Sequence, residues 1–187
     1  MFGWLATHVA HLCPRAAGIE VERRCLRIVP QLLARHLSAT GPVLYMPYVA
    51  PVASGATVPG LLAGCRELAP LLRVHWLVAA SAIGSDGPHE WLECRARDGR
   101  LCARLHLLPD SDYLGWDALL AAGMAVQAAH GPQPDDGYIS VARLLEFRCH
   151  RIAGLDLLDA LPATGISALG DGIARGIARA EGLALDS

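Results

Sequence analysis

The sequence predicts an α+β fold: an antiparallel β-sheet with a hairpin at about residues 89–108, flanked by helices. Two observations lead to this prediction. Apolar and polar residues alternate on both sides of Asp98-Gly99, which is a dipeptide typical of hairpin turns. Pro109 then ends the second strand, and Asp110-Ser111-Asp112 supplies N-cap side chains for a helix with Tyr113 and Trp116 on its buried stripe.

The register of the hairpin follows if Asp98 and Gly99 form a two-residue type I′ turn, in which both residues have positive φ. One face then pairs Trp91 with His106, Glu93 with Arg104 and Arg95 with Cys102. The other face is apolar and pairs Leu92 with Leu105, Cys94 with Ala103 and Ala96 with Leu101. We expect the apolar face to pack on the core and the charged face to be solvated, with Cys94 and Cys102 on opposite faces.

Upstream of the hairpin, the stretch from Glu20 to Leu37 predicts an amphipathic helix, kinked or broken at Pro30. Residues 43–52 are rich in β-formers, and the two prolines among them confine a strand to sheet edges or bulges. A further helix is expected from Val58 to Leu72.

Downstream, residues 130–137 have the composition of an exposed loop. Tyr138 to Ile152 favours a helix, with a strand as the alternative, and helices are expected at Leu155 to Leu161 and Ile166 to Glu181. We therefore expect residues 1–187 to form one domain, with a sheet-and-helix core at residues 20–137 and a mainly helical segment at residues 138–187.

The composition excludes several classes of function. The net charge is -2 and every basic residue is arginine, which argues against a nucleic-acid surface and excludes lysine chemistry. The uncharged run from Leu37 to Cys65 is interrupted by prolines and glycines, so no membrane span is predicted. The six cysteines form no Cys-x-x-Cys pair, which indicates free thiols in a reducing, cytoplasmic setting. Histidines 8 and 11 share a helical face but lack a third metal ligand nearby.

The stretch from Trp76 to Leu119 resembles the cytoplasmic haem-utilisation proteins, the haemin-degrading or haem-carrier family. Its order is a Trp-x-Val strand at Trp76 to Val78, a strand and glycine turn at Trp91 to Gly99, a strand at Leu101 to Leu108, and a helix containing Trp116-Asp117-Ala118-Leu119. An arginine-rich helix at Arg23 to Leu37 and a strand at Pro42 to Val49 also fit this order.

This chain departs from the family pattern where the family carries a Gly-x-x-Gln-Ile-His-Thr-Gly run. Val49 to Val58 fills that place and contains no histidine. The family's haem-ligand histidine has no clear match here, and the chain would be a single-repeat relative of longer, two-repeat members. Haem is therefore the cofactor that the resemblance implies, but it assigns no ligand residue.

The residues themselves suggest where such a ligand would bind. Neutral imidazoles are iron ligands, aromatic rings stack on flat ligands, and guanidinium groups pair with carboxylates. Six residues are candidates on these grounds: His75, His106, Arg95, Arg104, Trp91 and Tyr48. The alternative is an ordinary solvated strand face, with hydrogen-bonded histidines and a cross-strand pair between Glu93 and Arg104.

We therefore expect a protein that binds or carries haem, or another small hydrophobic ligand, without a covalent link. The alternative is a non-enzymatic interaction or regulatory module that has lost haem binding, and its glycine-rich C-terminal helix would suit a homodimer. The sequence contains no recognisable catalytic motif. An enzyme acting on a tetrapyrrole is a third alternative.

Overall fold

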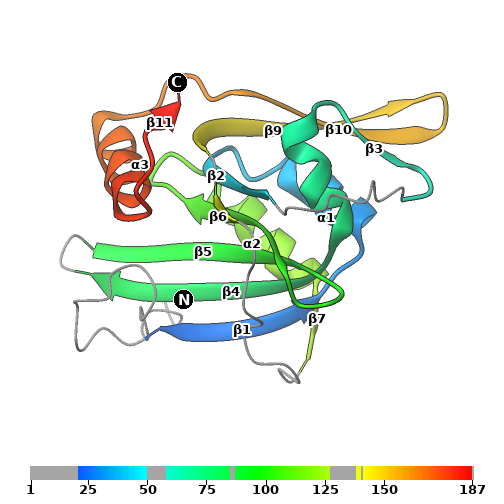
Figure 1. The fold of residues 1–187 in the computed structure, drawn as a ribbon, viewed down its shortest axis with the longest axis horizontal. Helices are drawn as coiled ribbons and strands as arrows, with labels where there is room; N and C mark the ends of the chain where they lie inside the picture. The colour runs from blue at the N-terminus through cyan, green and yellow to red at the C-terminus, as the bar shows by residue number, and fades with distance from the viewer. Residues whose placement is uncertain (1–20, 50–57, 85–86, 127–137, 140, 187) are drawn as a thin grey trace.

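The computed structural model describes residues 21–49, 58–84, 87–126, 138–139 and 141–186 (Figure 1). Its α-helices are α1 (Pro30–Leu37), α2 (Tyr113–Ala122) and α3 (Ala168–Ala180), and η1 (Arg66–Arg73) is a 3₁₀ helix. The strands are β1 (Glu22–Arg27), β2 (Pro42–Val49), β3 (Leu61–Ala63), β4 (Val74–Gly84), β5 (Gly87–Ala96), β6 (Leu101–Leu107), β7 (Met124–Ala125), β8 (Tyr138–Ile139), β9 (Ala142–Ile152), β10 (Leu155–Pro162) and β11 (Leu185–Asp186).

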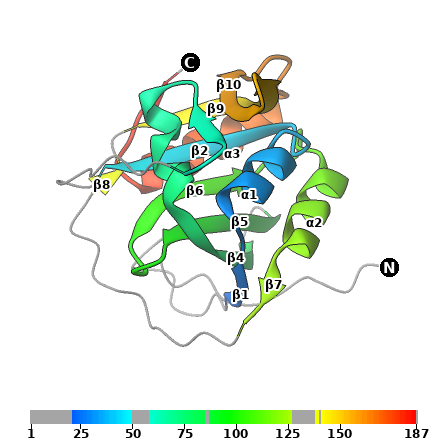
Figure 2. The same ribbon diagram turned by 90° about the vertical axis from the view of Figure 1, so that its right-hand side faces the viewer.

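These strands form a largely antiparallel sheet in the order β3-β10-β9-β2-β6-β5-β4-β1-β7. Along this order only β3 and β10 run in parallel; off it, β11 joins β9 in parallel and β8 pairs with β2. The predicted α+β class with an antiparallel sheet is therefore confirmed. Figure 2 shows α1 and α2 side by side on one face of the sheet, with α3 beyond β2 and β6.

Three buried clusters follow this arrangement, the third of them small and made of Val21, Ala80, Ala82 and Trp91. The largest one joins α1, η1 and α2 to one face of the sheet, and it includes Leu37, Leu77, Leu92, Leu105 and Trp116. The second one lies on the opposite face of β2, where Leu44 and Met46 pack with α3. Strand β2 is thus covered on both faces, which explains its nearly continuous apolar sequence.

The position of β2 corrects the expectation that Pro47 confines it to a sheet edge or bulge, because it lies between β9 and β6; Pro51, the other proline of that expectation, lies outside the described residues. Pro42 is its first residue. Pro47 is the last residue paired with β6 and lies beyond Tyr45, the last residue paired with β9. Both prolines therefore stand where ladder pairing begins or ends, and a missing N–H is tolerated there.

The predicted hairpin is confirmed, with Trp91 opposite His106, Glu93 opposite Arg104, and Cys94 opposite Ala103. Its turn differs from the predicted type I′, because Gly99 has positive φ (85°) and Asp98 does not. The Gly99 N–H donates to the Ala96 carbonyl at 3.0 Å, and the Ala96 N–H donates to the Arg100 carbonyl at 2.8 Å. These bonds define a three-residue loop, a type I turn followed by a left-handed glycine.

A bulge follows from this longer loop and shifts the pairing near the turn. Arg95 pairs with Leu101 and not with Cys102 as predicted. Cys102 then has no partner on β5, and its side chain packs in the same core cluster as Cys94. Both thiols are free. The expectation that they point to opposite faces is wrong, because an extra residue breaks the two-residue alternation.

The predicted helix from Glu20 to Leu37, which the resemblance placed at Arg23 to Leu37, is divided into β1 and α1. Val29 is extended, as residues before proline usually are, and Pro30 occupies the first turn of α1. In β1, six consecutive residues pair with β4, and Leu26 is fully buried. Arg23, Arg24 and Arg27 are therefore strand residues, whereas Arg35 lies in α1.

Three further predicted helices, at residues 58–72, 138–152 and 155–161, are also wrong. Residues 58–72 form β3 and then η1, which contains Pro70, a residue without the N–H that a regular helix needs. Residues 142–162 form the β9–β10 hairpin, so the segment 138–187 is not mainly helical. In β9 the apolar residues Leu145, Phe147 and Cys149 contact the core with strand periodicity.

Helices α2 and α3 agree better with prediction. The Asp112 side chain caps α2 by accepting from the N–H groups of Leu114 (2.9 Å) and Gly115 (3.0 Å), as the sequence indicated. Tyr113 is exposed, although it was expected on the buried stripe. Helix α3 confirms the expected C-terminal helix. Within the described ranges, no helix is long and apolar enough to cross a membrane.

Candidate functional site

The face of β1, β4, β5 and β6 opposite α1 and α2, here called the polar face, carries most of the candidate residues. Residues directly opposite each other in neighbouring strands project to the same side. The pairings therefore define one row containing Arg23, Ala80, Trp91, His106 and Leu44. The next row contains Cys25, Val78, Glu93, Arg104 and Met46.

The polar face was expected to be solvated, but its central residues are buried. Trp91, Glu93 and His106 expose only 3%, 4% and 1% of their surface. Burying polar groups costs free energy unless they are paired. The partners of these three residues therefore determine what this face can do.

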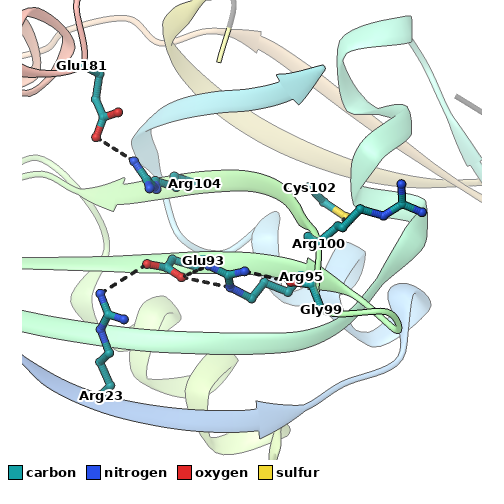
Figure 3. Close-up of polar contacts among 8 residues, drawn as sticks. All are labelled: Arg23, Glu93, Arg95, Gly99, Arg100, Cys102, Arg104 and Glu181. Atoms are coloured by element: carbon teal, nitrogen blue, oxygen red, sulfur yellow. Dashed lines mark hydrogen bonds and ion pairs between the residues drawn. The ribbon is translucent and has the colours of Figure 1, made fainter. Parts of the chain in front are cut away.

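Glu93 lies at the centre of a group of arginines (Figure 3). Arg95 donates to one carboxylate oxygen through Nε at 3.0 Å and Nη2 at 2.7 Å. Arg23 approaches the other oxygen at 3.7 Å. Burial tends to raise the pKa of Glu93, but Arg95, Arg23 and Arg104 outweigh it, so the pKa is lowered and the carboxylate stays charged.

Arg104 joins the polar face to the end of α3. Its Nη1 donates to Glu181 Oε1 at 2.6 Å, and the two side chains are 19% and 20% exposed. Glu181 is the C-cap residue of α3. The Nε of Arg104 is buried and has no hydrogen-bond partner. This arginine therefore has an unused donor directed within the protein.

His106 has two unused ring nitrogens. Both are buried, and neither has a hydrogen-bond partner. Burial, with Arg104 and His89 as smaller causes, lowers the pKa of His106 to about 3. Its ring is stacked near Trp91, with the ring centroids 6.2 Å apart and the planes at 23°. At neutral pH the site thus contains an uncharged imidazole with a free lone pair.

Four of the six candidates lie on the polar face: Trp91 with His106 in one row, Arg104 in the next, and Arg95 one row beyond Glu93. His75 does not lie beside His106. It precedes Trp76, which pairs with Arg95, so His75, like Arg95, is about four residues along the sheet from Trp91, or roughly 13 Å at the usual strand rise. His75 contacts the edge of the Trp76 ring at 4.6 Å between centroids, and burial, Arg97 and Arg27 lower its pKa.

Tyr48 also lies apart from the His106 row. It is four residues along β2 from Leu44 and pairs with Ile139 of β8. Its partly exposed ring is not in either of the large clusters. The sequence therefore placed Tyr48 correctly on a strand, but the fold does not place it beside the histidine.

Sequence reasoning missed three residues of this site. Glu93 was assigned to an exposed cross-strand pair, Arg23 to a helix, and Glu181 to the end of a helix without a role. The central position of Glu93 follows from the predicted register, so that signal was available. Contacts of Arg23 and Glu181 depend on long-range packing, which no local pattern indicates.

In the described part of the chain, no group of three or more His, Cys, Asp or Glu side chains is arranged to hold a metal ion. The histidine pair at positions 8 and 11 lies outside the described residues, as does the loop at 130–137. A haem iron needs only one imidazole from this face, and His106 has the required neutral nitrogen.

Comparison with known proteins gives little. No protein-family model matches the sequence, and no curated protein matches it. Among solved structures, one similar chain is holo-PhuS, a haem-binding protein from Pseudomonas aeruginosa, at 16% sequence identity and a TM-score of 0.37. The match covers 62% of this chain and 40% of that protein. Similarity at this level carries no argument about the ligand.

Proposed function

We propose that this protein binds haem, or another tetrapyrrole, without a covalent bond on the polar face, with His106 as the iron ligand. One observation carries the proposal: His106 is buried, uncharged at neutral pH and free at both ring nitrogens. Neutral imidazole is the form that ligates iron. A buried polar group without a partner costs free energy, and a ligand bond would recover it.

The neighbours of His106 fit the chemistry of such a ligand. The Trp91 indole lies nearly parallel to the imidazole and offers a flat apolar surface. Arg104 is in the row next to His106, and Arg95 is one row further along the same face. Guanidinium groups suit the carboxylate side chains of a tetrapyrrole. The resemblance of the Trp76–Leu119 stretch to haem-utilisation proteins favours haem, carried in the cytoplasm, over other flat anions.

Access to His106 requires movement. The ring is 1% exposed, and its row continues into Leu44, which packs with α3. A bound tetrapyrrole would therefore have to displace part of the cover on this face. A ligand smaller than haem would displace fewer of the residues that cover His106.

The proposal is tested by titrating the purified protein with haemin and following the Soret band. Binding at micromolar haemin should shift the band in the wild type. His106→Leu should abolish the shift of an iron–imidazole complex, whereas His75→Leu should retain it. Circular dichroism of both variants controls for folding. An unshifted Soret band in the folded wild type would contradict the proposal.

The second candidate is an interaction or regulatory module on the same fold. It is favoured by one observation: Arg95 and Arg104 already hold internal carboxylates. In that case the polar face would be a buried structural network, and a homodimer is the expected partner. Sedimentation equilibrium tests the dimer, and a monomeric mass at working concentration would exclude it.

A further inference from the structure

The contact between Arg104 and Glu181 joins two parts of the chain that are 77 residues apart, the sheet and the end of α3. It uses only Nη1 of the guanidinium. A carboxylate bound side-on would instead use Nε and Nη2, the two donors that Arg95 directs to Glu93. Because Nε of Arg104 is buried without a partner, Glu181 satisfies this arginine incompletely.

The place of Glu181 matters because α3 adjoins the proposed site. Ala174, Ile177 and Ala178 of α3 pack with Leu44 and Met46. Those two β2 residues stand directly beside His106 and Arg104 in their rows. The last turn of α3 therefore borders both candidate residues, and Figure 3 shows Glu181 reaching Arg104 from that helix.

The charges around Arg104 favour only one bound carboxylate in addition to the neighbouring Glu93. Glu93 is already opposite Arg104 in the register and is compensated mainly by Arg95. A ligand carboxylate added beside both Glu93 and Glu181 would meet two like charges at short range, which is unfavourable. A ligand carboxylate and Glu181 should therefore exclude each other.

We propose that Arg104 is a carboxylate-exchange site: Glu181 occupies it in the ligand-free protein, and a carboxylate of the ligand replaces Glu181, which releases the last turn of α3 from the sheet. This deepens the proposed function and rests on it for the identity of the ligand. Exchange of carboxylates at Arg104 does not itself require haem, so the two ideas can be tested apart.

The first experiment needs no tetrapyrrole. Glu181→Ala removes the internal carboxylate, and sodium acetate at tens of millimolar should then raise the melting temperature of this variant more than that of the wild type. Sodium chloride at equal ionic strength is the control for screening. Asp171→Ala, which breaks the exposed Arg175 pair on the same helix (2.8 Å), is the matched variant and should gain nothing specific from acetate. Equal effects of acetate on all three proteins would overturn the exchange site.

The second experiment measures competition. Glu181→Gln keeps the shape of the side chain and removes its charge, so it should bind haemin roughly fivefold more tightly than the wild type, the scale of one partly exposed ion pair. Haemin dimethyl ester, which has no free carboxylate, should bind the two proteins equally. Asp171→Asn should match the wild type for both ligands. Weaker haemin binding by Glu181→Gln would overturn competition, and an acetate effect without any haemin binding would refute haem while retaining the site.

Discussion

On the α1–α2 side of β5, Leu92 and Cys94 are completely buried among aliphatic and aromatic side chains. On the other side of the same strand, Trp91 and Glu93 are nearly as buried. Arginines lie around Glu93, and Trp91 lies beside His106 and packs with Val21, Ala80 and Ala82. Two faces of one sheet thus reach similar burial with opposite chemistry.

This difference shows that the polarity of a strand face does not determine its exposure. The apolar face is stabilised by non-directional burial, at about 25 cal/mol per Å². The polar face depends on each group finding a partner. Glu93 has two arginines close to it. In contrast, the ring nitrogens of His106 and the Nε of Arg104 have no hydrogen-bond partner. The unpaired groups are what make the polar face a candidate site.

The largest effect should come from opening a hole in the apolar face. Leu119 of α2 is fully buried in the core cluster, so Leu119→Ala should lower the free energy of unfolding by about 3 kcal/mol, from lost burial and the remaining cavity. Urea denaturation measures it. Leu114→Ala is the control on the same helix, because Leu114 is 82% exposed, and a loss there above about 1 kcal/mol would contradict the assignment of the two sides of α2.

On the polar face, removing the central carboxylate should cost slightly less. Glu93→Ala leaves Arg95, whose side chain is 12% exposed, without its main partner, and we expect a loss of about 2–3 kcal/mol at pH 7.

The pH dependence of the Glu93 contribution has a definite sign. The folded pKa of Glu93 lies below its unfolded value despite burial, because of Arg95, Arg23 and Arg104. The contribution is therefore complete above the unfolded pKa of about 4.3 and is lost as the pH falls through the folded pKa. Urea titrations at several pH values should show the wild type and Glu93→Ala converging in acid. A constant difference down to pH 2 would contradict the role of the arginines.

His106 should also make the protein lose stability as the pH falls, but starting from a higher pH than Glu93 does. Its folded pKa is lowered to about 3 by burial, Arg104 and His89, whereas the unfolded pKa is about 6.5. Protonation then favours the unfolded chain, so His106 makes the protein lose stability as the pH falls from 6.5 towards 3, by at most about 1.4 kcal/mol per pH unit. His106→Leu should lose less stability than the wild type between pH 6.5 and pH 4 in urea titrations. Parallel curves for the two proteins would mean that the ring is not held neutral.

Local sequence signals were sufficient for the hairpin and the cap of α2. The alternation around Asp98-Gly99 fixed which residues of β5 and β6 face each other, and it brought four of the six candidate residues to one surface. The loop length was missed because a type I turn with Gly99 in the left-handed region is compatible with the same dipeptide. That one residue shifted Arg95 and Cys102 in the register.

The long-range parts could not be predicted in this way. The run before Pro30 has apolar residues at both helical and strand spacings, and only pairing with β4 determines that it is a strand. The adjacent leucines at 144 and 145 suggested a helix, but one packs beside α3 and the other faces the core cluster on the opposite side of the sheet. The burial of Glu93 likewise depends on elements that are distant in the sequence.

The smallest effect is expected for the exposed ion pair at the turn of the same hairpin. Asp98 accepts from Arg100 at 2.7 Å, but the two side chains are 46% and 48% exposed, so water screens the pair. The hydrogen bond from Arg100 lowers the pKa of Asp98, and even so Asp98→Asn should cost less than about 0.5 kcal/mol in urea denaturation. The ratio of this loss to that of Glu93→Ala isolates burial, because both carboxylates are bound by an arginine two residues away. If the two losses were equal, the energetic distinction between the buried polar face and the solvated turn would be wrong.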